Sequence, residues 1–247
     1  MSGHSHWATI KHKKGALDAK KGKMFSKFAR QLMVLAREGG DNPAFNVSLA
    51  KAIREAKQGG MPMDKIELAV RKGAGKVEGQ SIETKTYEGK GAGGVMIIVE
   101  TMTDNANRTA GEIRKLFERS NGALINPGAA VNQFERKGFI YIAAQGVKDQ
   151  ELENAAIDAG ADNIERQGEV WMIATSFEAF NGVVSTLEKK FKIEASKTPL
   201  VPKYDNYVAL SESDARKAKH LIDLLEDHDD VQEVHHNGNI PDSVAAE

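Results

Sequence analysis

Apolar residues recur at steps of three and four through the first third of the chain, the spacing of helices with one buried face. The first stripe comprises Met24, Phe28, Leu32 and Leu35. Two further stripes run from Val47 to Ala56 and from Ile66 to Val70. Each is followed by a glycine, which can end a helix in a left-handed cap: Gly39-Gly40, Gly59-Gly60 and Gly73. The pattern predicts three short helices, the second with its start signal at Asp41-Asn42-Pro43.

From Ser81 onward the pattern changes to short apolar runs that alternate with helical stripes. The predicted strands are Val95–Val99, Ala130–Phe134, Phe139–Ala143, Val170–Ala174, Tyr207–Leu210 and Val231–His235. The predicted helices are Asn107–Ser120, Leu152–Ala159, one that follows a capping box of Thr175 and Glu178, and one that starts at Ser211 with Asp214. Strands and helices in this rhythm predict two α+β units of split β-α-β topology.

Charge is distributed very unevenly along a chain of 247 residues whose formal net charge is only −1. Residues 1–76 carry 16 Lys and Arg against 6 Asp and Glu, a net charge of +10. Residues 77–147 are balanced, whereas residues 148–247 carry 10 cations against 21 acids, a net charge of −11. A cationic head joined to an acidic tail predicts that the head meets a polyanion, which makes nucleic acid the expected partner.

Composition excludes several kinds of site and of cellular location. The chain has no cysteine, which excludes disulfides, thiolate metal sites and cysteine nucleophiles. No apolar run approaches the roughly 20 residues that span a bilayer, so no membrane partner is expected. The N-terminus is polar where a secretory signal would be apolar. We therefore expect a cytoplasmic protein.

No motif in the sequence supports catalysis or a bound cofactor. The run Gly89 to Gly94 matches the text of a dinucleotide-binding motif, but it leads into a strand and not into a helix. The histidines lack the spacing of a metal site, and no Gly-x-Ser-x-Gly nucleophile elbow is present. The clustered carboxylates at residues 226–230 are interpreted as a solvated helix end. We expect no enzyme activity, no cofactor and no metal site.

The basic head supplies the candidate site residues. The cations expected on phosphates are Lys11, Lys13, Lys14, Lys20, Lys21, Lys23, Lys27 and Arg30. His4, His6, Trp7 and His12 lie among them and are added as candidate contacts. Phe25 and Phe28 could stack on bases or belong to the core, and the sequence leaves both open. Lysine outnumbers arginine, which favours contact with the backbone over reading of base edges.

Several blocks of this sequence resemble the YebC/PmpR family. They are the opening run Met1 to Lys14, the run Asp18 to Lys27, Gly39 to Pro43, Tyr87-Glu88-Gly89 and Thr103 to Thr109. The resemblance covers essentially the whole chain. Because the chain opens directly on the first of these blocks, it resembles the bacterial members that lack a targeting segment.

The resemblance implies an α+β, multidomain fold. It has a helical domain at residues 1–78 and an α+β domain at residues 79–134 plus 201–247. A ferredoxin-like α+β domain at residues 135–200 is inserted in the latter. It also implies a DNA-binding transcriptional regulator, which is our principal expectation. The alternative is a translation factor that contacts ribosomal RNA or tRNA on ribosomes stalled at proline-rich stretches. Charge alone does not separate the two, and the absence of an obvious helix-turn-helix reading face mildly favours RNA.

Overall fold

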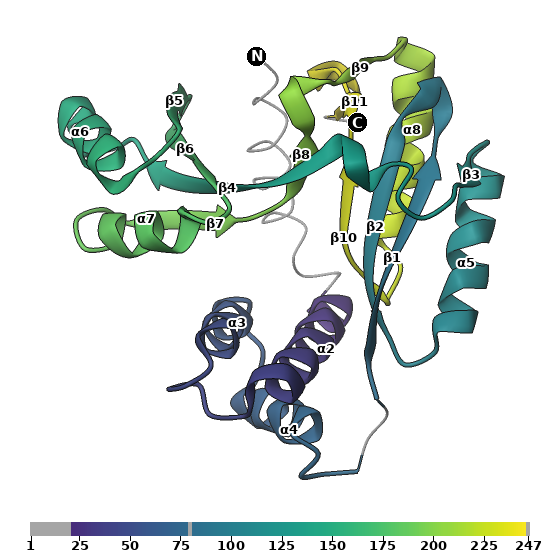
Figure 1. Ribbon diagram of the computed structural model, residues 1–247, viewed down its shortest axis with the longest axis horizontal. Coiled ribbons are helices and arrows are strands. Elements are labelled where there is room, and N and C mark those ends of the chain that lie inside the picture. Colours follow the sequence, from purple (N-terminus) through teal and green to yellow (C-terminus); the bar gives the residue numbers. More distant parts are fainter. Residues whose placement is uncertain (1–20, 79–80, 246–247) are drawn as a thin grey trace.

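The computed structural model describes residues 21–78 and 81–245 (Figure 1). The predicted contacts His4, His6, Trp7, Lys11, His12, Lys13, Lys14 and Lys20 lie outside the described residues. The described part is an α+β, multidomain structure, as expected. A helical bundle is followed by two antiparallel sheets, each with helices packed on it.

Three helices form the N-terminal bundle, as the apolar stripes predicted: α2 (Lys21–Gly39), α3 (Val47–Gln58) and α4 (Met63–Gly73). Leu32, Leu49 and Ile66 are fully buried in its core, and Phe25 and Phe28 pack against that core. Phe25 and Phe28 therefore serve the bundle interior. The start of α3 differs from the prediction, because Asn46 and not Asp41 caps the helix by accepting a hydrogen bond from the Leu49 N–H.

The first sheet has the strand order β10-β2-β1-β3. Its strands are β1 (Glu83–Lys90), β2 (Met96–Thr103), β3 (Ala123–Leu124) and β10 (Val231–His236). Helices α5 (Ala106–Arg119) and α8 (Glu212–Glu226) cover one face, where Ile97, Val99, Phe117 and Leu221 share a core. Both β2 and β3 pair antiparallel with β1, so β2-α5-β3 is a split β-α-β unit, as predicted.

The second sheet has the order β5-β6-β4-β7. Its strands are β4 (Phe134–Ala143), β5 (Asn163–Gln167), β6 (Val170–Ser176) and β7 (Ile193–Lys197). Helices α6 (Asp149–Ala159) and α7 (Phe180–Leu187) pack on it. β6 separates β4 from β5, and β4 separates β6 from β7, which gives the two split β-α-β units of a ferredoxin-like fold.

The two sheets are joined by β4, which extends from one toward the other (Figure 1). The chain returns through β8 (Leu200–Pro202), which pairs antiparallel with Phe134 to Arg136 at the start of β4. It then enters β9 (Val208–Ala209), which pairs with β11 (Gly238–Asn239), before the final helix α9 (Asp242–Ala245). The chain thus leaves the first sheet through β4 and returns to it through β8, as expected of an inserted unit. The domain boundaries themselves stay a prediction.

Two local predictions are wrong for physical reasons. The predicted strand at Ala130 begins only at Phe134, because the N–H groups of Gly128, Ala130 and Val131 donate to the Glu88 carboxylate and not to another strand. The predicted capping box at Thr175 is also wrong. The Thr175 hydroxyl donates to the Ser176 carbonyl, and the Ser176 hydroxyl accepts from the Ala179 N–H just before α7.

Candidate nucleic-acid interface

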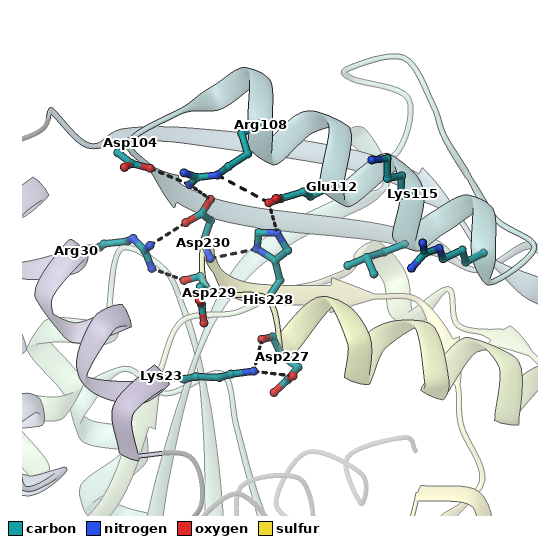
Figure 2. A pocket seen from close by; sticks show the side chains of 12 residues that line it. Lys23, Arg30, Asp104, Arg108, Glu112, Lys115, Asp227, His228, Asp229 and Asp230 are labelled. Atoms are coloured by element: carbon teal, nitrogen blue, oxygen red, sulfur yellow. Dashed lines mark hydrogen bonds and ion pairs between the residues drawn. The ribbon is translucent and has the colours of Figure 1, made fainter.

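Four predicted phosphate contacts lie within the described residues, and all of them are on α2: Lys21, Lys23, Lys27 and Arg30. Positions 23, 27 and 30 are separated by four and three residues, which places them on one face of the helix. That face is turned toward the C-terminal end of α8 and the turn that follows it, residues 226–230, which we call the acidic turn (Figure 2).

Each of these three cations has a partner in the acidic turn. Lys23 Nζ lies 2.7 Å from Asp227 Oδ2, and Lys27 Nζ donates to the Glu226 carbonyl at 2.8 Å. Arg30 Nη2 lies 2.8 Å from Asp230 Oδ1, and its Nη1 donates to the Asp229 carbonyl. The carbonyls at the end of α8 also carry the negative end of the helix dipole, which favours cations there. The interpretation of residues 226–230 as a simply solvated face is therefore wrong.

Asp230 is the buried centre of this contact, with only 2% of its surface exposed. Its Oδ2 receives Arg108 Nη2 at 2.8 Å, the Thr109 hydroxyl at 2.6 Å and the Thr103 hydroxyl at 3.1 Å. Burial by itself would raise the pKa of Asp230. The hydrogen bonds from Thr109 and Arg108 and the charge of Arg30 outweigh burial and lower that pKa. Asp230 is thus held as a carboxylate that joins α2, α5 and β2.

His228 extends the same network toward α5. The Asp230 N–H donates to His228 Nδ1 at 3.1 Å, so the neutral ring carries its proton on Nε2, which lies 3.0 Å from Glu112 Oε2. Ligand atoms of Glu112, His228 and Asp230 lie within 4.8 Å of one another, close enough for a metal ion. Two guanidinium groups already neutralise Asp230, so the arrangement suits ion pairing better than metal binding.

A second group of possible ligands, Glu100, Glu233 and His235, lies at the joint between β2, β10 and β4. Arg136 from β4 pairs with Glu100 and donates to the Thr198 carbonyl at 2.8 Å. Burial alone would raise the pKa of Glu100, but the partners His235 and Arg136 lower it overall. This group ties the second sheet to the first, and we assign it a structural role.

A pocket of about 580 Å³ opens between α2, α5 and the acidic turn (Figure 2). Lys23 and Arg30 line it on the α2 side, while α5 contributes a stripe of side chains on the other. That stripe is Arg108, Glu112, Lys115, Leu116 and Arg119. The phosphate contacts predicted from the sequence lie in the basic head alone and include no residue of α5. The spacing of 108, 112, 115 and 119 was the available signal, because it places charged side chains on one helix face.

The described residues contain no helix with the length and hydropathy needed to cross a membrane.

Comparison with known proteins covers nearly the whole chain. Residues 5–76 match the model of the TACO1/YebC protein N-terminal domain, and residues 82–238 match that of the TACO1/YebC second and third domain. A relative from Dictyoglomus thermophilum is 46% identical over 246 residues, covering 99% of this chain and 98% of its own length. One from Rubrobacter xylanophilus is 44% identical, covering 100% and 99%. Both are named "Probable transcriptional regulatory protein".

A solved structure has the same fold. The crystal structure of a conserved hypothetical protein from Aquifex aeolicus superimposes with a TM-score of 0.85 at 42% identity, covering 96% of this chain and 98% of the other.

Proposed function

Because this chain belongs to the TACO1/YebC family, we propose that it is a nucleic-acid-binding regulatory protein that acts on transcription through DNA. The relatives' shared name, probable transcriptional regulatory protein, supports the regulatory role. The proposal is one of binding and involves no catalysis.

The observation that carries the proposal is the concentration of positive charge at one end of the chain. Residues 1–76 have a net charge of +10 in a protein that is otherwise acidic. Lys and Arg gain affinity for a phosphate polymer by displacing its condensed counterions, a gain that does not depend on base sequence. A lysine-rich head is therefore suited to positioning the protein on a nucleic-acid backbone.

Three of the cations of α2 are already engaged within the protein. Lys23, Lys27 and Arg30 bind carboxylate and carbonyl oxygens of the acidic turn. These are anionic or partly negative oxygens, as phosphate oxygens are. A nucleic-acid backbone that reaches this face of α2 must therefore compete with the acidic turn, whereas Lys11 to Lys20 precede that face in the chain.

The proposal is tested by substituting Lys13, Lys14, Lys20 and Lys21 together with Ala. Binding to duplex DNA should weaken about equally for unrelated sequences, because backbone contacts carry no sequence information. The slope of log affinity against log salt should fall by roughly 0.9 for each phosphate that the variant no longer binds. Fluorescence anisotropy with labelled duplexes over a salt series measures both quantities.

The matched control removes four lysines from the acidic two thirds of the chain. Lys148, Lys189, Lys190 and Lys203 provide the same change in net charge. The control should keep the wild-type salt slope. An unchanged slope in the head variant, or equal decreases in both variants, would contradict the proposed role of the head.

A further inference from the structure

Two cations on α5 line the pocket without a partner in the described part of the chain. Lys115 and Arg119 are exposed and lie four residues apart, so they project from the same face of the helix, next to Leu116. Among the described residues neither side chain forms a hydrogen bond or an ion pair. Figure 2 shows Lys115 on the pocket side of α5, beyond Glu112.

Among the described residues, the other charges around the pocket are already paired, apart from the exposed carboxylate of Asp229, whose residue is bound only through its backbone carbonyl, by Arg30. Arg108, earlier on the same stripe, binds Asp230 and Asp104, each at 2.8 Å. Glu112, the acid between Arg108 and Lys115, binds His228. On the opposite wall, Lys23 and Arg30 bind the acidic turn. Glu118, the acid nearest to Arg119 in sequence, does not line the pocket. The positive charge left for a ligand in this conformation is therefore on the second half of α5.

We propose that Lys115 and Arg119 form a second contact with the phosphodiester backbone of a nucleic acid. They lie on α5, which covers the first sheet, and are not part of the basic head. This inference rests on the proposed function and adds a surface that the charge of the head does not reveal. Arg119 offers a planar fork that can bind two phosphate oxygens at once, and Lys115 adds a point charge beside it. A backbone crossing the pocket would then meet α5 on one side and Lys23 and Arg30 of α2 on the other.

Cations near the end of a helix also stabilise its dipole, which would account for Lys115 and Arg119 without any ligand. That explanation predicts a change in stability when they are removed and no change in nucleic-acid binding. The two explanations therefore separate in a binding measurement.

The test compares the double variant Lys115→Gln and Arg119→Gln with Lys189→Gln and Lys190→Gln. The control pair lies just beyond the C-terminal end of α7 on the other sheet, is exposed, and removes the same charge. Affinity for a labelled DNA duplex and for a folded RNA hairpin is measured over a salt series in the full-length protein. We expect the α5 variant to bind several-fold more weakly. Its salt slope should be smaller by about 1.8 on the duplex, or roughly 0.9 for each phosphate.

A variant with Lys115→Arg and Arg119→Lys keeps both charges and should retain the salt slope. Circular dichroism and the thermal midpoint establish that each variant is folded. The nucleic acid whose slope changes identifies the source of the phosphates. If the wild type binds duplex DNA and the α5 variant keeps its slope, or weakens no more than the control, the α5 contact is wrong while the function stands. If the wild type binds only the RNA hairpin, the function through DNA is wrong, and the slope on RNA tests the α5 contact. If the wild type binds neither DNA nor RNA, both proposals fall.

Discussion

At the scale of single residues, Asp230 joins three elements of the described part of the chain. One carboxylate, 2% exposed, holds Arg30 of α2, Arg108 and Thr109 of α5 and Thr103 of β2. A lone buried charge is very unfavourable, and Asp230 is stable only because these donors satisfy its oxygens. Removal of the charge would leave Arg30 without its carboxylate partner, and Arg108 would keep only Asp104 and Glu112.

We expect Asp230→Asn to lower the free energy of unfolding at pH 7 by about 2–4 kcal/mol, the usual cost of breaking a buried charged network. Urea denaturation followed by circular dichroism measures this. Asp227→Asn is the matched control, because Asp227 is half exposed in its pair with Lys23. That variant should be destabilised by less than about 1 kcal/mol, as exposed pairs are. Equal destabilisation of the two variants would contradict the role assigned to Asp230.

Asp230 should also make the stability of the protein depend on pH. The folded protein lowers the pKa of Asp230, so the stabilisation is fully present above the unfolded value of about 3.9. It disappears as the pH falls through the lower, folded pKa. The difference in stability between wild type and Asp230→Asn should therefore be constant from pH 7 to about pH 5 and shrink below pH 4. If the difference in stability between wild type and Asp230→Asn grew as the pH fell, the stabilisation would not come from the ionised form of Asp230.

At the scale of elements, the close approach of α4 to α2 depends on a glycine. The sequence pattern suggested a left-handed helix cap at Gly73, yet its backbone remains helical, and the nearby positive φ is at Gly75. A Cβ at position 73 would overlap the backbone carbonyl of Met33 in α2. Gly73 is therefore required by packing between helices and not by the end of a helix.

Gly73→Ala should destabilise the bundle by about 1–3 kcal/mol, because backbone atoms cannot move aside as a side chain can. Gly111→Ala in α5 is a control of identical chemistry, since nothing lies within 4 Å of a Cβ built there. That variant should gain about 0.5–1 kcal/mol from the better helix propensity of alanine. Thermal denaturation of both variants shows whether one stability change is negative and the other positive. Two stability changes of the same sign would contradict the role of Gly73 in the packing of α4 on α2.

The elements also show which parts of the fold a sequence pattern can reveal. All three bundle helices, α5 and β2 were predicted, because the helices have a clear apolar period and β2 contains a continuous apolar run. Strand β1 was missed since Glu83 to Thr86 are exposed and polar, and its position is set by pairing with β2. The Glu88 carboxylate likewise organises the turn at Gly128 to Val131 by accepting hydrogen bonds from backbone N–H groups 40 or more residues away, which no local pattern reveals.

At the scale of the whole molecule, the basic head contacts the acidic tail. The charge segregation could be read from the sequence, but the pairing of Lys23, Lys27 and Arg30 with the acidic turn could not. It joins residues about 200 positions apart and depends on the docking of α2 beside α8. The spacing along α5 indicated a charged face, but not that this face lies opposite α2 and the acidic turn across a pocket.

If α2 binds phosphate with the cations that now contact the acidic turn, removal of a competing carboxylate should strengthen binding. We expect Asp227→Asn to raise affinity for duplex DNA by about 1.4- to 5-fold, the equivalent of an exposed ion pair. Asp223→Asn, which removes the same charge from a pair with Lys219 within α8, is the control. Anisotropy titrations at one salt concentration suffice. Equal gains in both variants would indicate only a change in net charge.

Strand β4 belongs to both halves of the α+β region, with Phe134 buried under the first sheet and Ile142 in the core of the second. Its ten residues are a continuous hydrogen-bonded strand, clamped at its base by β8 and by Arg136 on Glu100. A binding partner that displaces the ferredoxin-like unit would therefore act through β4 on the sheet that carries α5 and the pocket.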